Sequence, residues 1–261
     1  MSLITRKGLR DKLLWPWTPE SDREAGSGVV SNFLLHWFPN RISLKSFAFG
    51  YSFYLGVMSF VLFLILTVTG VVLMFLYVPS VERAYGSIKD LEFAISFGWL
   101  LRRVHRISAH LMVAVVFLHM FRVFLTGAYK AGSVMKSARP VNWVIGVSLL
   151  VLTLLLSFTG YLLPWDQLAM WAITVGSNMA RATPFLGYEG PGAALLTLGD
   201  ISLVSNTSDA RFALLGGTFV GEGALLRFYV LHCVGLPLIA GFLMAVHFWR
   251  IRRDGGISGP L

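Results

Sequence analysis

The sequence predicts an all-α membrane protein built as a bundle of four transmembrane helices. Of its 261 residues, 56% are hydrophobic and only 13% are charged, a composition typical of multi-pass membrane proteins and not of soluble enzymes. Four apolar segments each exceed the roughly 20 residues needed to cross a bilayer. The basic residues, which give a formal net charge of +9, gather at the ends of these segments. They therefore indicate membrane topology and not a nucleic-acid surface.

The chain before the first apolar segment, residues 1–45, is polar and mixed in charge. It contains no apolar run of signal-peptide length, so we expect no cleavable signal. We predict an N-terminal arm on the cytoplasmic side, with a short interfacial helix at Arg6–Leu14. His36 in this arm is expected to be an ordinary interfacial histidine. Residues 46–261 are predicted to form one four-helix domain.

The predicted spans are followed by links of very different composition. We place the spans at about residues 47–77, 97–127, 141–163 and 224–250. The third ends before Pro164, because proline lacks the amide donor that a helix needs. Residues 165–223 are rich in Gly, Pro, Ser and Thr, and we predict short helices and loops at one membrane surface.

Lys and Arg concentrate in the N-terminal arm, in the link after the second span and in the C-terminal tail. The positive-inside rule therefore places both termini on the cytoplasmic side of a bacterial inner membrane, or on the equivalent negative side of another energy-transducing membrane.

Two of the predicted spans carry a pair of histidines each. His105 and His119 are fourteen residues apart in the second span, which separates them by about 21 Å along a helix and leaves them within about 40° of one direction. His232 and His247 are fifteen apart in the fourth span, about 22 Å and within about 60°. Both spans run in the same direction, so we pair His105 with His232 near the positive side and His119 with His247 near the negative side.

Two imidazoles on opposite faces of an iron leave no open coordination position, which favours electron transfer over oxygen or substrate chemistry. The single cysteine, Cys233, excludes a CxxCH haem attachment and a cysteine-held iron–sulfur cluster in this chain. The four histidines therefore predict two non-covalent b-type haems. His110 points about 140° away from His105 on a helix, and we expect it to have a packing role.

Basic residues and glycines accompany the histidines. Arg102 and Arg106 flank His105, and Arg122 follows His119, so each could pair with haem propionates at membrane depth. The first and third spans carry glycines at the same fourteen-residue interval, namely Gly56 with Gly70 and Gly146 with Gly160. We interpret them as bare backbone against which a flat macrocycle packs, although close helix packing also uses small residues.

Several stretches resemble the cytochrome b family, in its short, split form, cytochrome b6. They are FGWLLRRVHR, FLHMFRVFLTGAYK, SFTGYLLPWDQ, WAITVGSNMARATPFLG, LRFYVLH and HFWRIRRDGGISGPL. The resemblance extends from about Phe47 to the last residue. The fifteen-residue histidine spacing in the last span and the ending SGPL are similar to the split form.

This resemblance implies a dihaem subunit of a quinol:cytochrome c oxidoreductase, or of one with a plastocyanin-like acceptor. In this family electrons cross the membrane between quinol-oxidation and quinone-reduction sites, in a Q cycle coupled to proton translocation. The implied partners are a Rieske iron–sulfur protein, a c-type cytochrome and lipid, in a dimeric complex. The resemblance places residues 160–187 at the quinol-oxidation pocket and Arg252 near the quinone-reduction pocket.

The sequence departs from the family pattern at three places. It has no PEWY motif, so we expect a separate PEWY-bearing subunit, no catalytic residue in this chain alone and no turnover without partners. Tyr54 stands where a cysteine attaches an extra haem in photosynthetic-type relatives, which argues against an additional covalent haem here. About twenty extra residues, Glu189–Arg211, lengthen the surface segment.

Two other functions are compatible with the residues. The first is a dihaem membrane anchor that passes electrons between quinone and a bound hydrogenase, dehydrogenase or reductase. The second is a haem-free transporter or scaffold in which the histidines relay protons. A b-type absorption spectrum distinguishes the haem proteins from the transporter, and a PEWY-bearing partner distinguishes the quinol oxidoreductase from the anchor.

Overall fold

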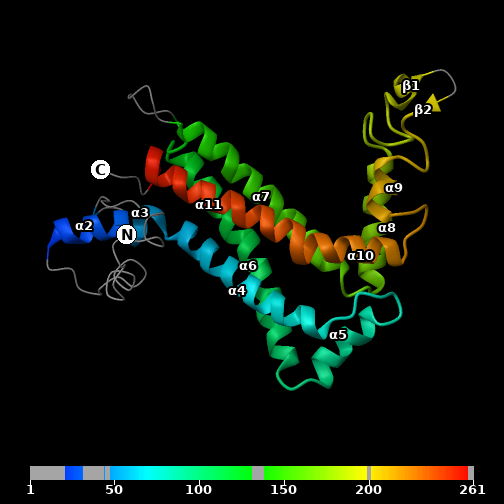
Figure 1. Ribbon diagram of the computed structural model, residues 1–261, viewed down its shortest axis with the longest axis horizontal. Coiled ribbons are helices and arrows are strands. Elements are labelled where there is room, and N and C mark those ends of the chain that lie inside the picture. Colours follow the sequence, from blue (N-terminus) through cyan, green and yellow to red (C-terminus); the bar gives the residue numbers. More distant parts are fainter. Residues whose placement is uncertain (1–20, 32–43, 45–47, 131–137, 199–200, 258–261) are drawn as a thin grey trace, which may run out of the picture. The chain divides into compact units, whose positions relative to one another are not determined.

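The computed structural model describes residues 21–31, 44, 48–130, 138–198 and 201–257 (Figure 1). This part of the chain is helical apart from one short hairpin. By its internal contacts the chain divides into two compact units. The first comprises Met1–Phe60, Val113–Leu152 and Ile239–Leu261, and the second comprises Val61–Met112 and Thr153–Leu238. The predicted helix at Arg6–Leu14 and His36 lie outside the described residues.

Four helices in the described chain are long and apolar enough to cross a membrane, as predicted. They are α4 (Leu55–Leu76), α6 (Gly98–Leu125), α7 (Arg139–Leu162) and the continuous helix Glu222–Asp254. At most 17% of the residues in the apolar window of any one of them are buried within the protein. Side chains that are this apolar and this exposed fit a lipid surface, because in water they would lose the hydrophobic stabilisation that burial gives.

The first span is shorter than the sequence predicts. A separate turn of helix, α3 (Phe49–Ser52), precedes α4, and the two are divided by Phe53 and Tyr54, whose φ angles are 51° and 50°. These left-handed conformations are unusual for residues with a side chain and interrupt a right-handed helix. Apolar residues continue through the break, so hydropathy could not locate it.

The fourth span is one continuous helix with an irregular turn. It consists of α10 (Glu222–Val230), a π-helical turn (Leu231–Gly235) and α11 (Leu236–Asp254). The N–H of Leu236 donates to the carbonyl of Leu231, which is five residues earlier. A π turn of this kind contains one residue more than an α turn, and such turns are often found at functional sites.

The second unit contains the main hydrophobic core of the described chain. Its centre is the segment after α7, where Trp165 is buried with a φ of 52° and Asp166 caps α8 (Gln167–Arg181) by accepting from the Ala169 N–H at 2.9 Å. The Tyr77 hydroxyl donates to the Leu163 carbonyl at 2.6 Å. The buried core residues are Tyr77, Ala84, Leu162, Trp165, Ala169, Ile173, Leu215, Ala224, Leu225 and Phe228.

The predicted surface segment between the third and fourth spans contains short helices, as expected. They are α8, a 3₁₀ helix (Ala193–Leu196) and α9 (Ala210–Leu215). An antiparallel hairpin of β1 (Thr197–Leu198) and β2 (Ile201–Ser202) lies between the last two. The sequence did not predict this hairpin, nor α2 (Asp22–Ser31) in the N-terminal arm, nor α5 (Ala84–Phe93) between the first two spans.

Candidate functional site

The second unit brings His105 of α6 and His232 of the π turn together. Their ring centroids are 6.3 Å apart and the ring planes cross at 73°. A metal–imidazole bond is about 2 Å long and the ligating nitrogen lies about 1 Å from its ring centre, so two imidazoles on opposite sides of one metal have centroids roughly 6 Å apart. The predicted pair therefore fits bis-histidine ligation of a single iron.

Two threonines fix which nitrogen of each ring is available. Thr69 Oγ1 lies 2.8 Å from His105 Nδ1, and Thr159 Oγ1 lies 3.1 Å from His232 Nδ1. Each hydroxyl donates its single hydrogen to the carbonyl four residues earlier in its own helix, at 2.6 and 2.8 Å. With that hydrogen on the carbonyl, each hydroxyl oxygen is left as an acceptor for Nδ1–H. This leaves Nε2 of both rings unprotonated and free to bind a metal. Sequence reasoning did not identify these threonines.

The four predicted glycines each lie against one of the four histidines. A Cβ added at these positions would approach the Cε1 atom of an imidazole, so the absence of a side chain makes room for the ring itself. The distances from such a Cβ to Cε1 are 2.5 Å at Gly160 against His232, 3.3 Å at Gly70 against His105, 3.3 Å at Gly56 against His119 and 3.6 Å at Gly146 against His247. The glycines have the same spacing as the histidines because each glycine lies directly against one imidazole.

The first unit contains the second predicted pair, His119 and His247, which lie close enough to interact electrostatically. The Nδ1 atom of His247 is buried and has no hydroxyl partner in the described chain, and the backbone group that interacts with this imidazole belongs to Asn142. The residues that precede the two glycines here are Leu55 and Ile145, which have no hydroxyl to offer. The two pairs thus have the same glycine contacts but different surroundings for Nδ1.

The π turn explains why the last span has a longer histidine interval. His232 and His247 are fifteen residues apart, one more than His105 and His119. His232 itself lies in the π turn, which takes up one residue more than an α turn. The π turn therefore accommodates the extra residue. The residues after it point in the directions that they would have in a regular helix with a fourteen-residue interval. An isolated sequence period cannot reveal this adjustment.

The predicted arginines mostly have protein partners. Arg102 Nη1 lies 2.8 Å from Glu92 Oε2, whereas the side chain of Arg106 is exposed. The Arg122 guanidinium donates two hydrogen bonds, of 2.7 and 3.2 Å, to the Tyr51 carbonyl of α3. Its contact stabilises the chain just before the break that begins α4. A role of these arginines at haem propionates stays a prediction.

The remaining predicted positions are single residues on the same helices. Arg252 is partly buried in the last turn of α11. His110 is exposed on α6. Tyr54, in the position of the attachment cysteine of photosynthetic-type relatives, is 37% exposed.

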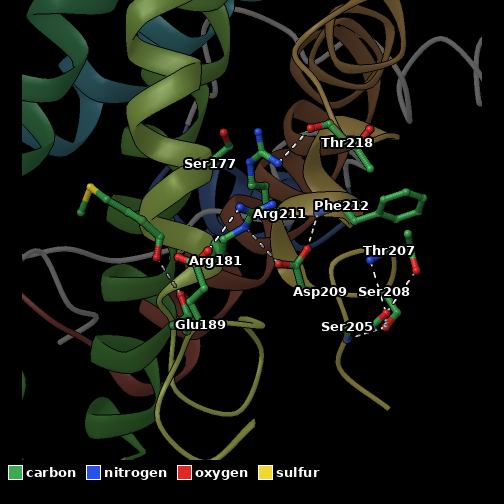
Figure 2. Close-up of polar contacts among 12 residues, drawn as sticks. Ser177, Arg181, Glu189, Ser205, Thr207, Ser208, Asp209, Arg211, Phe212 and Thr218 are labelled. Carbon is green, nitrogen blue, oxygen red and sulfur yellow. Dashed lines mark hydrogen bonds and ion pairs between the residues drawn. The ribbon is translucent and has the colours of Figure 1, made fainter. Parts of the chain in front are cut away.

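The segment around the predicted insertion is held to α8 by a buried carboxylate (Figure 2). Asp209 is 1% exposed, and its Oδ1 accepts from the Phe212 N–H at 2.7 Å at the start of α9. Its Oδ2 lies 3.8 Å from Nε of Arg181, the last residue of α8, and Nη1 of Arg181 lies 3.4 Å from Glu189 Oε1. Arg211 next to Asp209 donates to the Thr218 carbonyl. Both ends of the insertion therefore meet at Arg181.

Known proteins of one family are similar to this chain over most of its length. Residues 42–255 match the family model described as cytochrome b/b6/petB. Cytochrome b6 of Porphyra purpurea is 39% identical over 236 residues, which cover 86% of this chain and 97% of the relative. Cytochrome b6 of Synechococcus sp. (strain CC9311) is 38% identical over 237 residues, which cover 86% and 96%.

Among solved structures, a chain of a hyperthermophilic respiratory Complex III is similar, with a TM-score of 0.62 and 29% identity. The similarity covers 80% of this chain but 49% of that one, so this chain spans about half the length of that protein. These matches favour the first of the three functions that the sequence allowed. The chain belongs to the cytochrome b/b6 family, whose members are electron-transferring subunits of quinol oxidoreductases in energy-transducing membranes.

Proposed function

We propose that this chain holds two b-type haems and carries electrons across the membrane in a Q cycle. His105 and His232 would hold one haem, and His119 and His247 would hold the other. The observation that carries the proposal is the 6.3 Å separation of the His105 and His232 ring centroids, with both Nδ1 atoms engaged by threonines. This is the geometry expected when two Nε2 atoms face one iron.

When bound, each haem supplies a one-electron iron couple. The contribution of the chain would be to hold that couple between apolar helices through the imidazoles of His105 and His232, and of His119 and His247. Two imidazole ligands for each haem would leave no position for oxygen or substrate, which favours electron transfer. The glycine beside each imidazole leaves room for the ring, because a Cβ there would approach the ring carbon Cε1.

We further propose the topology and the partners that the family resemblance implies. The positive-inside pattern supports cytoplasmic termini in a bacterial inner membrane, with the His105 and His232 pair near the positive side. The sequence lacks a PEWY motif, so a second polypeptide would supply the glutamate that takes protons from quinol. A Rieske protein and a c-type or plastocyanin-like acceptor would receive electrons in a dimeric complex. Residues 160–187 would contribute to quinol oxidation, and Arg252 to quinone reduction.

Purification of the intact complex from native membranes tests this function. We expect a reduced-minus-oxidised spectrum with b-type absorption, two non-covalent haems per copy of this chain, and reduction of both by an added quinol. Identification of the co-purifying subunits should find a PEWY-bearing polypeptide and a Rieske protein. A complex without b-type absorption would refute the haem assignment, and a hydrogenase or formate dehydrogenase in place of the Rieske protein would indicate the membrane-anchor function.

A further inference from the structure

Thr69 and Thr159 occupy equivalent places in two different helices. Thr69 immediately precedes Gly70 in α4, and Thr159 immediately precedes Gly160 in α7. In each case the glycine faces an imidazole and the threonine hydroxyl lies within hydrogen-bond distance of Nδ1 of the same imidazole. The glycine of each dipeptide thus makes room for the ring, and the threonine offers its Nδ1 a hydrogen-bond partner.

The direction of these hydrogen bonds follows from the hydrogen count. A hydroxyl has one hydrogen and two lone pairs. In Thr69 the hydrogen is committed to the Ile65 carbonyl at 2.6 Å, and in Thr159 to the Leu155 carbonyl at 2.8 Å. Lone pairs then remain for the imidazoles, and this arrangement favours the tautomer with the hydrogen on Nδ1 in both rings.

An acceptor on Nδ1–H makes an imidazole a stronger electron donor through Nε2. In metal sites such outer partners fix the tautomer and orientation of the ligand and raise its basicity. A more basic axial ligand stabilises the ferric state more than the ferrous state, because the oxidised iron carries the greater positive charge. Two acceptors, one on each side of the iron, act in the same direction.

The pair formed by His119 and His247 has no threonine hydroxyl at the equivalent positions in the described chain. Leu55 and Ile145 precede its glycines, and in the described chain no hydroxyl bonds to the buried Nδ1 of His247, which interacts with the backbone of Asn142 instead. The hydroxyl acceptors therefore distinguish one candidate haem site from the other, although the glycine contacts are common to both.

We propose that Thr69 and Thr159 are positioning residues that hold the axial imidazoles of the haem shared by His105 and His232 in the Nδ1–H tautomer and lower the reduction potential of that haem. This proposal rests on the haem ligation argued above. It assigns to the two hydroxyls a function that neither helix packing nor the ligand set requires.

The test uses the purified complex, single variants and two readouts other than turnover. An anaerobic redox titration follows the absorption of each haem, and electron paramagnetic resonance records the axial geometry of each ferric haem. The variants are Thr69→Val and Thr159→Val, which remove the hydroxyl and keep the branched shape. The matched control is Thr67→Val in the same helix, whose hydroxyl donates to the Phe63 carbonyl.

We expect each valine variant to shift the ferric-to-ferrous ratio of one haem towards ferrous at a fixed potential, by roughly threefold to tenfold for the loss of one hydrogen bond. The resonance of that haem should change with it. The second haem, and both haems of Thr67→Val, should behave as in the unmodified complex. Thr69→Ser keeps the hydroxyl and should restore the unmodified ratio.

Three results would overturn the proposal. They are an unchanged titration in both valine variants, an equal shift in Thr67→Val, and a shift of both haems together. If Thr69→Val loses the haem, Thr69→Ser decides: retention with the unmodified ratio supports the proposal, and loss in both variants overturns it. Absence of bis-histidine haem from the unmodified complex would instead refute the proposed function on which the inference depends.

A reciprocal variant tests the same idea in the other pair. Ile145→Thr places a hydroxyl directly before Gly146, as Thr159 stands before Gly160 in the same helix. Nδ1 of His247 would then gain a hydroxyl acceptor like those of His105 and His232. We expect the ratio of the second haem to move towards ferric, and a movement towards ferrous would contradict the proposal.

Discussion

The imidazole of His232 lies directly over the backbone of Gly160, so close that a Cβ on that glycine would come within 2.5 Å of the ring carbon Cε1. Atoms without a bond between them do not approach this closely, and the ring could move away only by leaving its position opposite His105. The glycine is therefore required by the placement of the imidazole and not by a turn or an unusual backbone angle.

This contact predicts a graded effect of alanine at the four glycines. Gly160→Ala should displace His232 and reduce the haem content from two per chain to about one. Gly70→Ala and Gly56→Ala, at 3.3 Å, should weaken haem retention partially. Gly146→Ala, at an ordinary contact distance of 3.6 Å, should keep both haems. Haem quantification in the purified variants checks the order, and an equal loss in all four would contradict the steric explanation.

The π turn predicts an unusual tolerance to deletion. Removal of Val234, within the turn, should let the helix become regular and should leave two haems per chain, because the extra residue is lost where it is absorbed. Removal of Leu243, in α11, should rotate His247 by about 100° relative to its own helix and abolish one haem. Loss of a haem from the first variant and not the second would be opposite to this expectation.

The next prediction concerns Asp209, which attaches the insertion to Arg181 of α8. Asp209→Ala removes the cap of α9, at a cost of about 1 kcal/mol, and also leaves Arg181 without its buried partner. We expect faster proteolysis within residues 189–209 of the intact complex. Asp209→Asn keeps the capping oxygen and should give an intermediate rate.

The control for this prediction is Glu189→Gln. Glu189 is 60% exposed, and its contact with Arg181 is 3.4 Å long, so its loss should cost little. If Glu189→Gln accelerates cleavage as much as Asp209→Ala does, the buried carboxylate is not the principal attachment of the insertion.

Hydropathy and spacing predicted the parts of this protein that follow simple periods. The four spans were found because about 20 apolar residues must cover the bilayer. The pairing of His105 with His232 was predicted because two helices of the same direction bring similar histidine intervals, of fourteen and fifteen residues, together. The four glycines were predicted from the fourteen-residue interval, and each lies against an imidazole.

Features that depend on a single turn or hydrogen bond were not predicted. The break at Phe53 and Tyr54 lies inside an apolar run, and the π turn leaves no trace in hydropathy. A threonine in an apolar helix ordinarily bonds to a carbonyl of its own helix, and Thr69 does so as well. The repeated threonine–glycine pair was the one sequence signal for these hydrogen bonds. It can be interpreted only when the structure places an imidazole beside each pair.

The histidine pairing is the central claim, and haem analysis of single histidine variants tests it most directly. The complex should be purified with His105→Ala, His232→Ala, His119→Ala or His247→Ala, and the remaining haem identified by its redox titration. We predict that the first two variants lose one and the same haem and that the last two lose the other. Retention of both haems in any of these variants, or loss of the same haem in His105→Ala and His119→Ala, would contradict the account.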